Sequence, residues 1–414
     1  MIPYLLIFYY RFPRQTRGNW SFFEIGCDFV AVVGIICEYN PFHRGHLRQL
    51  RLVRAALGPE TAVVCAMSGN YVQRGMPAAW DKYARAEAAV AAGADLVLEL
   101  PLTGVLSSAE GFARAGVALL SSLGVVDVLS FGAECGDGAA LEALADRMEG
   151  PAFSEALRAG LDQGLPYAAA RQQAAGDTEG LLSQPNNILA LEYLRALRHL
   201  QSPLRPLVIA RNGDYHALTP DAEAPSASAL RAMLPGDGWQ SYVPPAAAKI
   251  LAAAPQYDFA HGERAVLARL RAMERQDWEA CAHGSEGLWS KAWRAAGTAP
   301  DCDAFLQAVK SKRYPLSRVR RLLLCAYLGV TQAELQRPVP YGRILAVGPA
   351  GRGLLRQARD TGALPLVNPG ARAPEPEYER LEQRTGDLFT LFAQPGASTP
   401  CGMDRTQRLI IEKS

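Results

Sequence analysis

Short apolar stretches alternate with longer amphipathic ones over the first half of the chain. Each short stretch is rich in aliphatic residues and ends at a loop with polar residues, glycine or proline, which is typical of a buried strand. We expect strands at 31–37, 61–67, 94–100, 125–131 and 206–210. Helical patterns lie between them, for example at 83–92 and 108–123. This alternation predicts an α/β fold, with a parallel sheet covered by helices on both faces.

Helical patterns dominate the remaining segments. Residues 136–182 read as alanine-rich helices joined by polar linkers, which suggests a helical insert or lid. A stretch rich in proline and aromatic residues, 239–245, predicts a boundary. Beyond it the period is helical to about residue 330, a late strand is expected at 340–347, and the tail has a helical pattern at 377–385. We therefore expect an α/β domain at 30–240 and a mainly helical region at 241–414.

The loop after the first strand carries the strongest chemical signal. It contains His43-Arg44-Gly45-His46, which stands where the following helix would begin. A helix N-terminus offers free N–H groups to a phosphate, Gly45 allows close approach of a ligand, and two imidazoles could donate to phosphate oxygens. Both histidines could instead be ordinary loop residues. Because two of the six histidines of the chain fall within four residues, we favour a nucleotide site.

Further candidates follow later strands and open later helices. Arg211 follows the fifth strand, where a guanidinium could clamp a triphosphate. Asn186 and Asn187 stand where helix N-caps are expected, and either could instead contact a nucleotide. Lys82 and Arg85 could contact phosphate or RNA, or could lie on a solvated helix face. The spacing leaves these alternatives open.

Charge is balanced over the chain as a whole but clustered at one place. There are 43 basic and 41 acidic residues, which gives a net charge of +2. Six basic residues fall within the stretch 310–321: Lys310, Lys312, Arg313, Arg318, Arg320 and Arg321. Such a cluster fits an RNA backbone, and it fits a solvated helix end equally well on charge alone.

Composition bounds the class of protein. A length of 414 residues with 49% hydrophobic content is enough for two or three domains with buried cores. The eight cysteines are scattered without a Cys-x-x-Cys pair or zinc spacing, so we expect reduced thiols, no structural metal and a cytoplasmic protein. The apolar N-terminal stretch is too short to cross a bilayer and lacks the features of a signal peptide, so no membrane partner is expected.

Longer strings in this chain resemble a known family. The His-x-Gly-His loop is similar to the signature of the nucleotidyltransferase superfamily, and EYNPFHRGHL resembles the tRNA(Met) cytidine acetate ligase family. The strings MSGNYVQRG, DKYARAEAA, GADLVLELP and LSFGAE follow in the order of that family. PNNILALEYL and SKRYPLSRVRRLLL are also similar to family segments. The last of these favours RNA as the partner of the basic cluster.

The resemblance implies a Rossmann-like ATP-binding domain and a two-step reaction. Acetate would attack the α-phosphate of ATP to give acetyl-adenylate and pyrophosphate, and N4 of the wobble cytidine of elongator tRNA(Met) would then take the acetyl group. Mg²⁺ would accompany the triphosphate, although no carboxylate constellation marks its site. His43 and His46 would be the catalytic residues. The oligomeric state stays open.

The resemblance also implies which residues bind each substrate. Ser228 and Leu230 stand where the family has threonine and isoleucine, and both changes are conservative. The basic cluster would bind tRNA. The ATP site would comprise Ile36, Cys37, Glu38, Tyr39, Asn40, Pro41, Phe42, His43, Arg44, Gly45, His46, Leu47, Arg48, Gln49, Gly132, Asn186 or Asn187, Arg211, Ser226, Ser228 and Arg231.

Two alternatives and one extension complete the expectations. The family usually begins just before the first strand, so residues 1–29 are expected to be a non-native extension and Val30 the native start. A small-molecule adenylyltransferase would share the His-x-Gly-His loop, but such proteins are usually short. A non-catalytic RNA-binding factor could retain a nucleotide-binding fold without turning over ATP.

Overall fold

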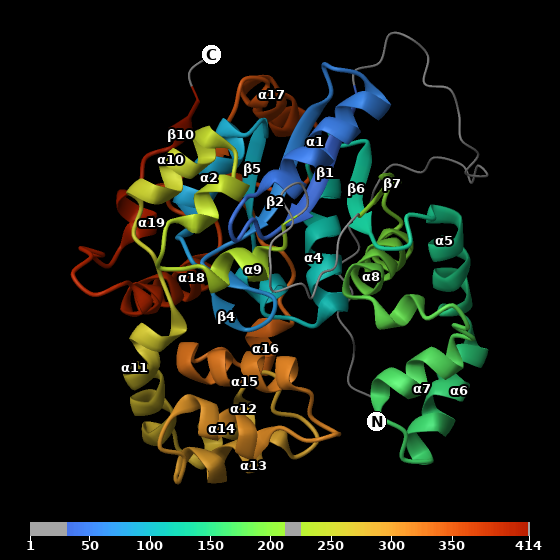
Figure 1. Cartoon of the computed structure of the whole chain (residues 1–414), viewed down its shortest axis with the longest axis vertical. Coiled ribbons are helices and arrows are strands. Elements are labelled where there is room, and N and C mark those ends of the chain that lie inside the picture. Colours follow the sequence, from blue (N-terminus) through green and yellow to red (C-terminus); the bar gives the residue numbers. More distant parts are fainter. Residues whose placement is uncertain (1–30, 212–224, 413–414) are drawn as a thin grey trace.

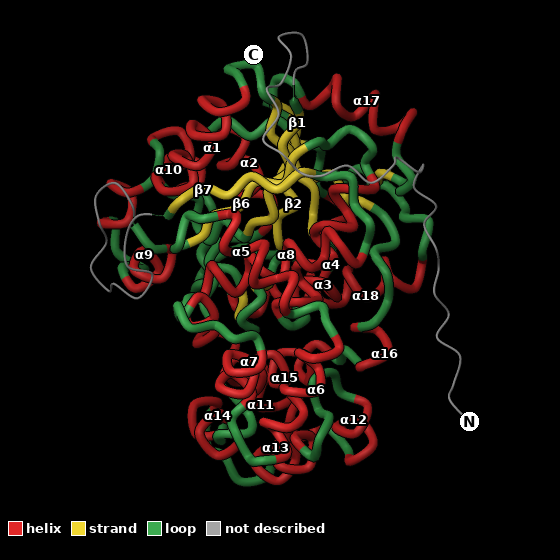
Figure 2. The backbone as a smooth tube through the Cα atoms, turned by 90° about the vertical axis from the view of Figure 1, so that its right-hand side faces the viewer, coloured by secondary structure: helices red, strands yellow, loops and turns green. Residues whose placement is uncertain are grey.

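The computed structural model describes residues 31–211 and 225–412. These residues form a twisted sheet with helices on both faces, and a second group of helices lies below one end of the sheet (Figures 1 and 2). The expected extension at 1–29 and the proposed start at Val30 lie outside the described residues.

All five expected strands are present, in one sheet. They run parallel in the order β5-β2-β1-β6-β7. Four of them start within two residues of the expected position, whereas the fourth starts three residues late because Val125, Val126 and Asp127 precede it in a loop. The bounds are β1 (Val32–Cys37), β2 (Ala62–Ser68), β5 (Leu96–Leu100), β6 (Val128–Ala133) and β7 (Arg205–Ala210).

Helices cover both faces of this sheet, which explains why the strands are continuously apolar. Alternate side chains of β1 enter two cores, Val32 and Ile36 on one face and Val33 and Ile35 on the other. The helices α4 (Ala109–Ser122) and α8 (Pro185–His199) pack on the first face, and α1 (Arg44–Leu57) and α2 (Lys82–Ala91) pack on the second.

Smaller elements extend these layers. The stretch 136–182 is helical as expected, and α10 packs on α2 through a core that contains Trp80 and Trp239. The bounds are α3 (Leu102–Val105), α5 (Gly138–Arg147), α6 (Pro151–Asp162), α7 (Tyr167–Ala174), η1 (Leu181–Ser183), α9 (Ala227–Ala232), η2 (Gly238–Tyr242) and α10 (Pro245–Ala253).

The lower group of helices has its own core. Trp278, Phe305 and Leu322 lie at its centre, and Tyr71 and Leu106 from the α/β part enter the same core. The two parts of the molecule are therefore packed together through apolar side chains. The bounds are α11 (Phe259–Ala272), α12 (Arg275–Ala280), α13 (Leu288–Ala296), α14 (Cys302–Val309), α15 (Leu316–Leu328) and α16 (Gln332–Leu335).

The last part of the chain returns to the sheet. The late strand predicted at 340–347 is confirmed as β8, which pairs antiparallel with β5, and β9 and β10 pair parallel with β8. Residues 241–414 are thus mainly helical, as expected, but they also complete the sheet; the domain boundary at residue 240 stays a prediction. The bounds are β8 (Gly342–Val347), α17 (Gly351–Thr361), β9 (Leu366–Val367), α18 (Pro376–Phe389), η3 (Thr390–Phe392), α19 (Met403–Thr406) and β10 (Ile410–Ile411).

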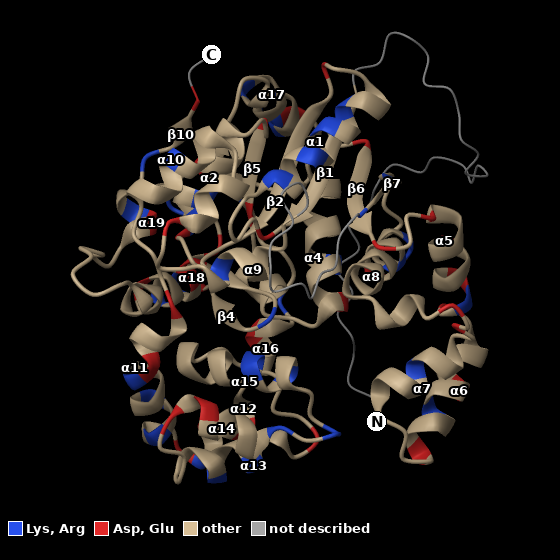
Figure 3. Cartoon of the chain, in the orientation of Figure 1, with Lys and Arg blue, Asp and Glu red and all other residues tan. Residues whose placement is uncertain are grey.

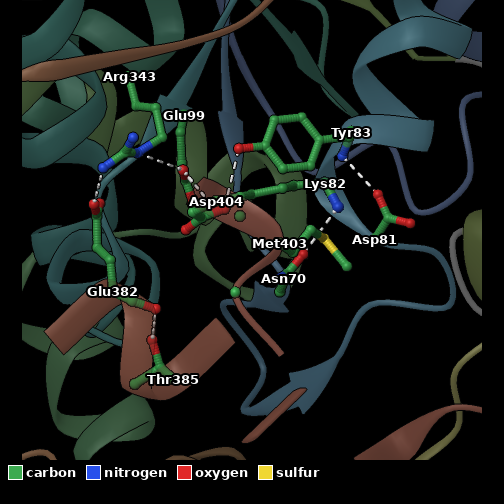
Figure 4. A network of polar contacts seen from close by, with 12 residues as sticks. Asn70, Asp81, Lys82, Tyr83, Glu99, Arg343, Glu382, Thr385, Met403 and Asp404 are labelled. Carbon is green, nitrogen blue, oxygen red and sulfur yellow. Dashed lines mark hydrogen bonds and ion pairs between the residues drawn. The ribbon is translucent and has the colours of Figure 1, made fainter. Parts of the chain in front are cut away.

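Buried ion pairs tie this returning segment to the parallel strands (Figure 4). The Nζ atom of Lys82 on α2 lies 2.6 Å from Oε2 of Glu99 and 2.9 Å from Oδ1 of Asp404 on α19. Arg343 on β8 lies 2.9 Å from Glu382 on α18. All five side chains are less than a tenth exposed. The network borders a small cavity that is also lined by backbone from the end of β2.

Within the described ranges no helix is both long enough and apolar enough to cross a bilayer.

Candidate active site

The His-x-Gly-His loop joins β1 to α1 at the carboxyl edge of the parallel strands. In open α/β sheets, ligands bind at this edge. Tyr39 has a φ of +43° and is buried, with its ring 4.7 Å from that of Phe42 and 4.8 Å from that of His46. These ring contacts hold the loop against the core, so His43 and His46 start from a fixed backbone.

The two histidines form a capping box at the first turn of α1. His43 Nδ1 accepts the N–H of Gly45 at 3.1 Å, and His46 Nδ1 accepts the N–H of His43 at 3.2 Å. A neutral imidazole that accepts at Nδ1 carries its proton at Nε2. Both rings therefore present an Nε2–H donor, and they are stacked with centroids 3.7 Å apart.

Gly45 is required by this arrangement. A Cβ atom at residue 45 would lie 2.9 Å from Cε1 and 3.0 Å from Nδ1 of His43. Contacts this short are repulsive, so any larger residue would displace the His43 ring from its capping position. The glycine between the histidines thus serves the geometry of the pair.

Electrostatics keep both histidines neutral. Burial lowers the pKa of His43 to about 3, and the positive charges of Arg211 and Arg231 add to this effect. Burial also lowers the pKa of His46 well below its usual value, with further contributions from His43 and Arg211. At neutral pH the pair therefore consists of neutral hydrogen-bond donors, and the positive charge near the loop comes from the arginines.

The N-terminus of α8 forms a second wall, built differently from our expectation. Asn186 and Asn187 are not N-caps, because α8 begins at Pro185 and Gln184 occupies the cap position. The carboxylate of Glu134, at the end of β6, accepts the N–H of Asn186 at 3.0 Å and that of Asn187 at 2.7 Å. Glu134 thus satisfies the free N–H groups of this helix end.

The two asparagines also differ from each other. Asn187 is buried and its Oδ1 accepts the N–H of Cys135 at 3.2 Å, so its side chain supports the loop. Asn186 is half-buried and its Oδ1 accepts a hydrogen bond from Arg211 Nη1 at 2.9 Å. Asn186 therefore orients Arg211, whereas Asn187 is part of the scaffold.

Gly132 and Arg211 lie together at the ends of neighbouring strands. A Cβ atom at residue 132 would be 2.9 Å from both Cγ and Cδ of Arg211. The aliphatic part of Arg211 thus crosses directly over the glycine, as the absence of a side chain there permits. This places a guanidinium beside the loop that carries the histidines, in agreement with its effect on their pKa values.

The short helix α9 brings a second guanidinium to the loop. Arg231 Nη1 donates to the carbonyl oxygen of Asn40 at 2.7 Å, and Nη2 donates to Ser228 Oγ at 3.2 Å. Ser226 caps α9 by accepting the N–H of Ala229 at 3.1 Å. The expected element 226–231 therefore lies against the His-x-Gly-His loop, with its hydroxyl groups and Arg231 held in place.

The other residues of the expected ATP site fall into two groups. The side chains of Ile36, Cys37, Tyr39, Pro41, Phe42 and Leu47 are buried or packed on the sheet cores, so these residues can offer only backbone to a ligand. The side chains of Glu38, Arg44, Arg48 and Gln49 are at least partly exposed. Arg48 donates to the carbonyl oxygen of Ala210 at 3.4 Å, and Gln49 donates to Ser130 at 3.4 Å.

Lys82 and Arg85 are not available for the phosphate or RNA contacts considered above. Lys82 belongs to the buried ion network, and Arg85 is fully buried. Arg85 donates to the carbonyl oxygens of Glu38 at 2.5 Å and Ser68 at 3.1 Å, and also to that of Gly69. It thereby ties the end of β1 to the end of β2, a structural role that a helix pattern alone does not reveal.

The basic cluster is only partly exposed. Lys310, Lys312 and Arg313 are exposed, and Arg318 and Arg320 are half-buried. Arg318 Nη1 lies 3.1 Å from Glu286, and Arg313 Nε lies 3.9 Å from the same carboxylate. Arg321 is buried, which lowers its pKa to about 10. The free charge of the cluster is therefore concentrated before and at the start of α15.

The chain was compared with known proteins. Residues 30–400 match the model of the HIGH nucleotidyl transferase family. The tRNA(Met) cytidine acetate ligase of Acetivibrio thermocellus is 34% identical, over 92% of this chain and 100% of the relative. That of Syntrophotalea carbinolica is 38% identical, over 86% and 88%.

Solved structures agree with these relatives. The crystal structure of apo Thermotoga maritima TmcAL has a TM-score of 0.84 at 27% identity and covers 92% of this chain and 100% of that one. The same protein bound with alpha-thio ATP has a TM-score of 0.82 at 27% identity, with 92% and 99% covered. The expected α/β fold is confirmed, and the chain belongs to the HIGH nucleotidyl transferase family and, within it, to the tRNA(Met) cytidine acetate ligases.

Proposed function

We propose that this protein activates acetate with ATP and transfers the acetyl group to N4 of the wobble cytidine of elongator tRNA(Met). The observation that carries the proposal is the pair of Nε2–H donors of His43 and His46 at the N-terminus of α1, flanked by Arg211 and Arg231. Donors aimed at a helix N-terminus with two guanidinium groups beside them suit a polyphosphate. The similar Thermotoga maritima protein binds alpha-thio ATP, which supports ATP as the nucleotide.

The residues present can accommodate ATP in one orientation. The phosphates would lie on the first turn of α1, within reach of the Nε2–H groups and of Arg211 and Arg231. The nucleoside would extend toward Gly132, where no side chain blocks the strand end. Of the two asparagines, Asn186 would contribute by holding Arg211, since Asn187 is used inside the scaffold.

The chemistry then follows in two balanced steps. A carboxylate oxygen of acetate forms a bond to the α-phosphorus of ATP while the bond to the bridging oxygen breaks, which releases pyrophosphate and leaves acetyl-adenylate. N4 of cytidine next attacks the acetyl carbon, AMP leaves, and the amine gives up a proton. The neutral histidines and the arginines would stabilise the negative charge that develops on the phosphate oxygens in the first step.

Mg²⁺ is expected to arrive with the triphosphate. Among the residues that the structure describes, no group of three or more histidine, cysteine or acidic side chains could hold a metal ion. The nearby carboxylate of Glu134 is occupied by the N–H groups of α8. The phosphates themselves would therefore carry Mg²⁺, and its contribution would be to neutralise their charge.

The RNA would dock on the basic cluster, with Lys310, Lys312 and Arg313 as the exposed phosphate contacts. Exposed lysine and arginine side chains suit a salt-dependent contact with the RNA backbone, whereas the buried Arg321 would support α15. A reaction on tRNA with ATP would take place in the cytoplasm.

The proposal is tested by pyrophosphate exchange into ATP in the presence of acetate. His46→Ala removes one Nε2–H donor and opens the capping box, so we expect exchange to fall by roughly a hundredfold or more, the scale of losing one oxyanion donor. Binding of tRNA, measured in parallel, should stay unchanged because the basic cluster lies elsewhere. Exchange near the wild-type rate in His46→Ala would contradict the assignment of the site.

A further inference from the structure

A small hairpin stands between the phosphate loop and the basic cluster. It comprises β3 (Tyr71–Val72) and β4 (Met76–Pro77), which pair antiparallel, and Gly75 N–H donates to the carbonyl oxygen of Val72 at 2.9 Å across the turn. The hairpin follows β2 and precedes α2. It therefore leaves the carboxyl edge of the sheet, where the proposed ATP site lies.

One side of the hairpin is bonded to the loop that leads to the histidines. The N–H of Gln73 donates to Oε1 of Glu38 at 2.8 Å, and the N–H of Ala79, just beyond β4, donates to Oδ1 of Asn40 at 2.8 Å. Asn40 also accepts, at its carbonyl oxygen, the hydrogen bond from Arg231. The hairpin is thus connected to the phosphate site through two side chains of the same loop.

The other side of the hairpin packs directly on α15. Gly75 has a φ of +75°, and a Cβ atom there would lie 2.6 Å from the backbone N of Arg321 and 2.7 Å from the carbonyl carbon of Arg320. Only a glycine fits at this contact, because both the backbone conformation and the space exclude a side chain. The turn and the arginine pair of α15 are therefore in fixed contact.

The base of the hairpin is anchored as well. The hydroxyl group of Tyr71 donates to the carbonyl oxygen of Thr385 at 2.8 Å, and the Tyr71 ring lies in the core of the lower helices. The segment is therefore a rigid connection between two sites, which is what precise placement of a substrate needs.

Positive charge continues from α15 onto the turn. Arg74 is exposed at the tip, next to Gly75. The Nε atoms of Arg320 and Arg321 are buried and have no hydrogen-bond partner among the described residues. Figure 3 shows basic residues on the turn beside β4 and on α15 just below it. A strip of guanidinium groups thus leads from the basic cluster toward the phosphate loop.

We propose that the hairpin 71–77 positions the target loop of the RNA, with Arg74 contacting a phosphate beside the nucleotide that enters the ATP site. This inference rests on the proposed function and adds the element that delivers the base. A cytidine in a single-stranded loop can be turned out of its stack, and a phosphate contact next to it fixes where its N4 arrives. Arg74 is a positioning residue and takes no part in acetate activation.

The experiment compares Arg74→Ala with the wild-type protein in the two half-reactions. We expect kcat/KM for acetyl transfer to tRNA to fall roughly tenfold or more, and the salt dependence of tRNA binding to weaken by about one phosphate contact. Acetate-dependent pyrophosphate exchange should keep its wild-type rate. Arg74→Lys, which retains the charge, should recover part of the transfer rate.

Arg356→Ala is the matched control. Arg356 is exposed on α17, which follows the antiparallel strand β8 and therefore lies at the opposite edge of the sheet. Its removal should change neither half-reaction. The inference is overturned if Arg74→Ala transfers acetyl as fast as wild type, or if its exchange activity falls in parallel with transfer. Wild-type protein that performs exchange but never acetylates tRNA would instead overturn the proposed function itself, and this inference with it.

Discussion

At the scale of single residues, the hydrogen-bonded state of each imidazole decides its chemistry. The sequence indicates that His43 and His46 belong to a phosphate site, but it does not indicate their tautomer or charge. Those follow from two backbone contacts to Nδ1 and from burial beside two arginines. The histidines can therefore donate from Nε2 without first taking up a proton.

The neutral state of the pair is open to direct measurement. Nitrogen-15 spectra of histidine-labelled protein should show both rings protonated at Nε2 alone from about pH 8 to about pH 5, because the pKa of His43 is lowered to about 3 and that of His46 is also lowered. His43→Gln and His46→Gln would assign the signals. A ring that titrates near its usual pKa of 6.5 would contradict this description.

The sign of the linkage also follows from these shifts. Below the usual histidine pKa, the unfolded chain binds more protons than the folded one, because both folded-state pKa values are depressed. The two histidines should therefore leave stability unaffected at neutral pH and reduce it as the pH falls below about 6.5.

Other predictions from single residues failed where burial or distant partners decide. Asn186 and Asn187 read as helix caps, but the cap position is one residue before the helix starts at Pro185, and Glu134 supplies the acceptor from another strand. Lys82 and Arg85 read as exposed or ligand-binding, yet both are buried. No local pattern shows that a carboxylate or a carbonyl from a distant segment will meet these cations.

At the scale of elements, periodicity predicts long segments well and short ones poorly. The five parallel strands and the main helices were predicted because each is long enough to show its period. The hairpin β3–β4 and the strands β9 and β10 were missed, since each strand has only two residues. The strand β8 was predicted, but its pairing with β5 was not, because pairing between distant segments leaves no local signal.

That distant pairing is secured by the buried network around Lys82, which allows a stability test. Lys82→Met leaves Glu99 and Asp404 buried without their shared cation, so we expect the free energy of unfolding to fall by about 3–5 kcal/mol in urea denaturation. The matched control is Arg275→Met, which breaks an exposed ion pair with Glu279 and should cost less than about 0.5 kcal/mol. Equal effects of the two substitutions would show that the network does not hold β8 and α19 in place.

At the scale of the whole molecule, two sites of different chemistry are held in one rigid arrangement. The phosphate loop lies at the carboxyl edge of the sheet, the basic cluster lies at the start of α15, and the hairpin contacts both. The sequence predicted each site separately, but the contact between them could not be predicted, since it depends on how the lower helices pack on the sheet. This arrangement suits an enzyme that activates a small acid at one site and delivers it to a large RNA at the other.

The measurement that tests this account most directly is incorporation of label from radiolabelled acetate into bulk tRNA, with and without ATP. We predict label in tRNA only when ATP is present, located at N4 of the wobble cytidine of tRNA(Met). Release of pyrophosphate with another small substrate but no label in tRNA would identify a simple adenylyltransferase. Binding of RNA without any turnover of ATP would identify a non-catalytic factor, and either result would contradict the account.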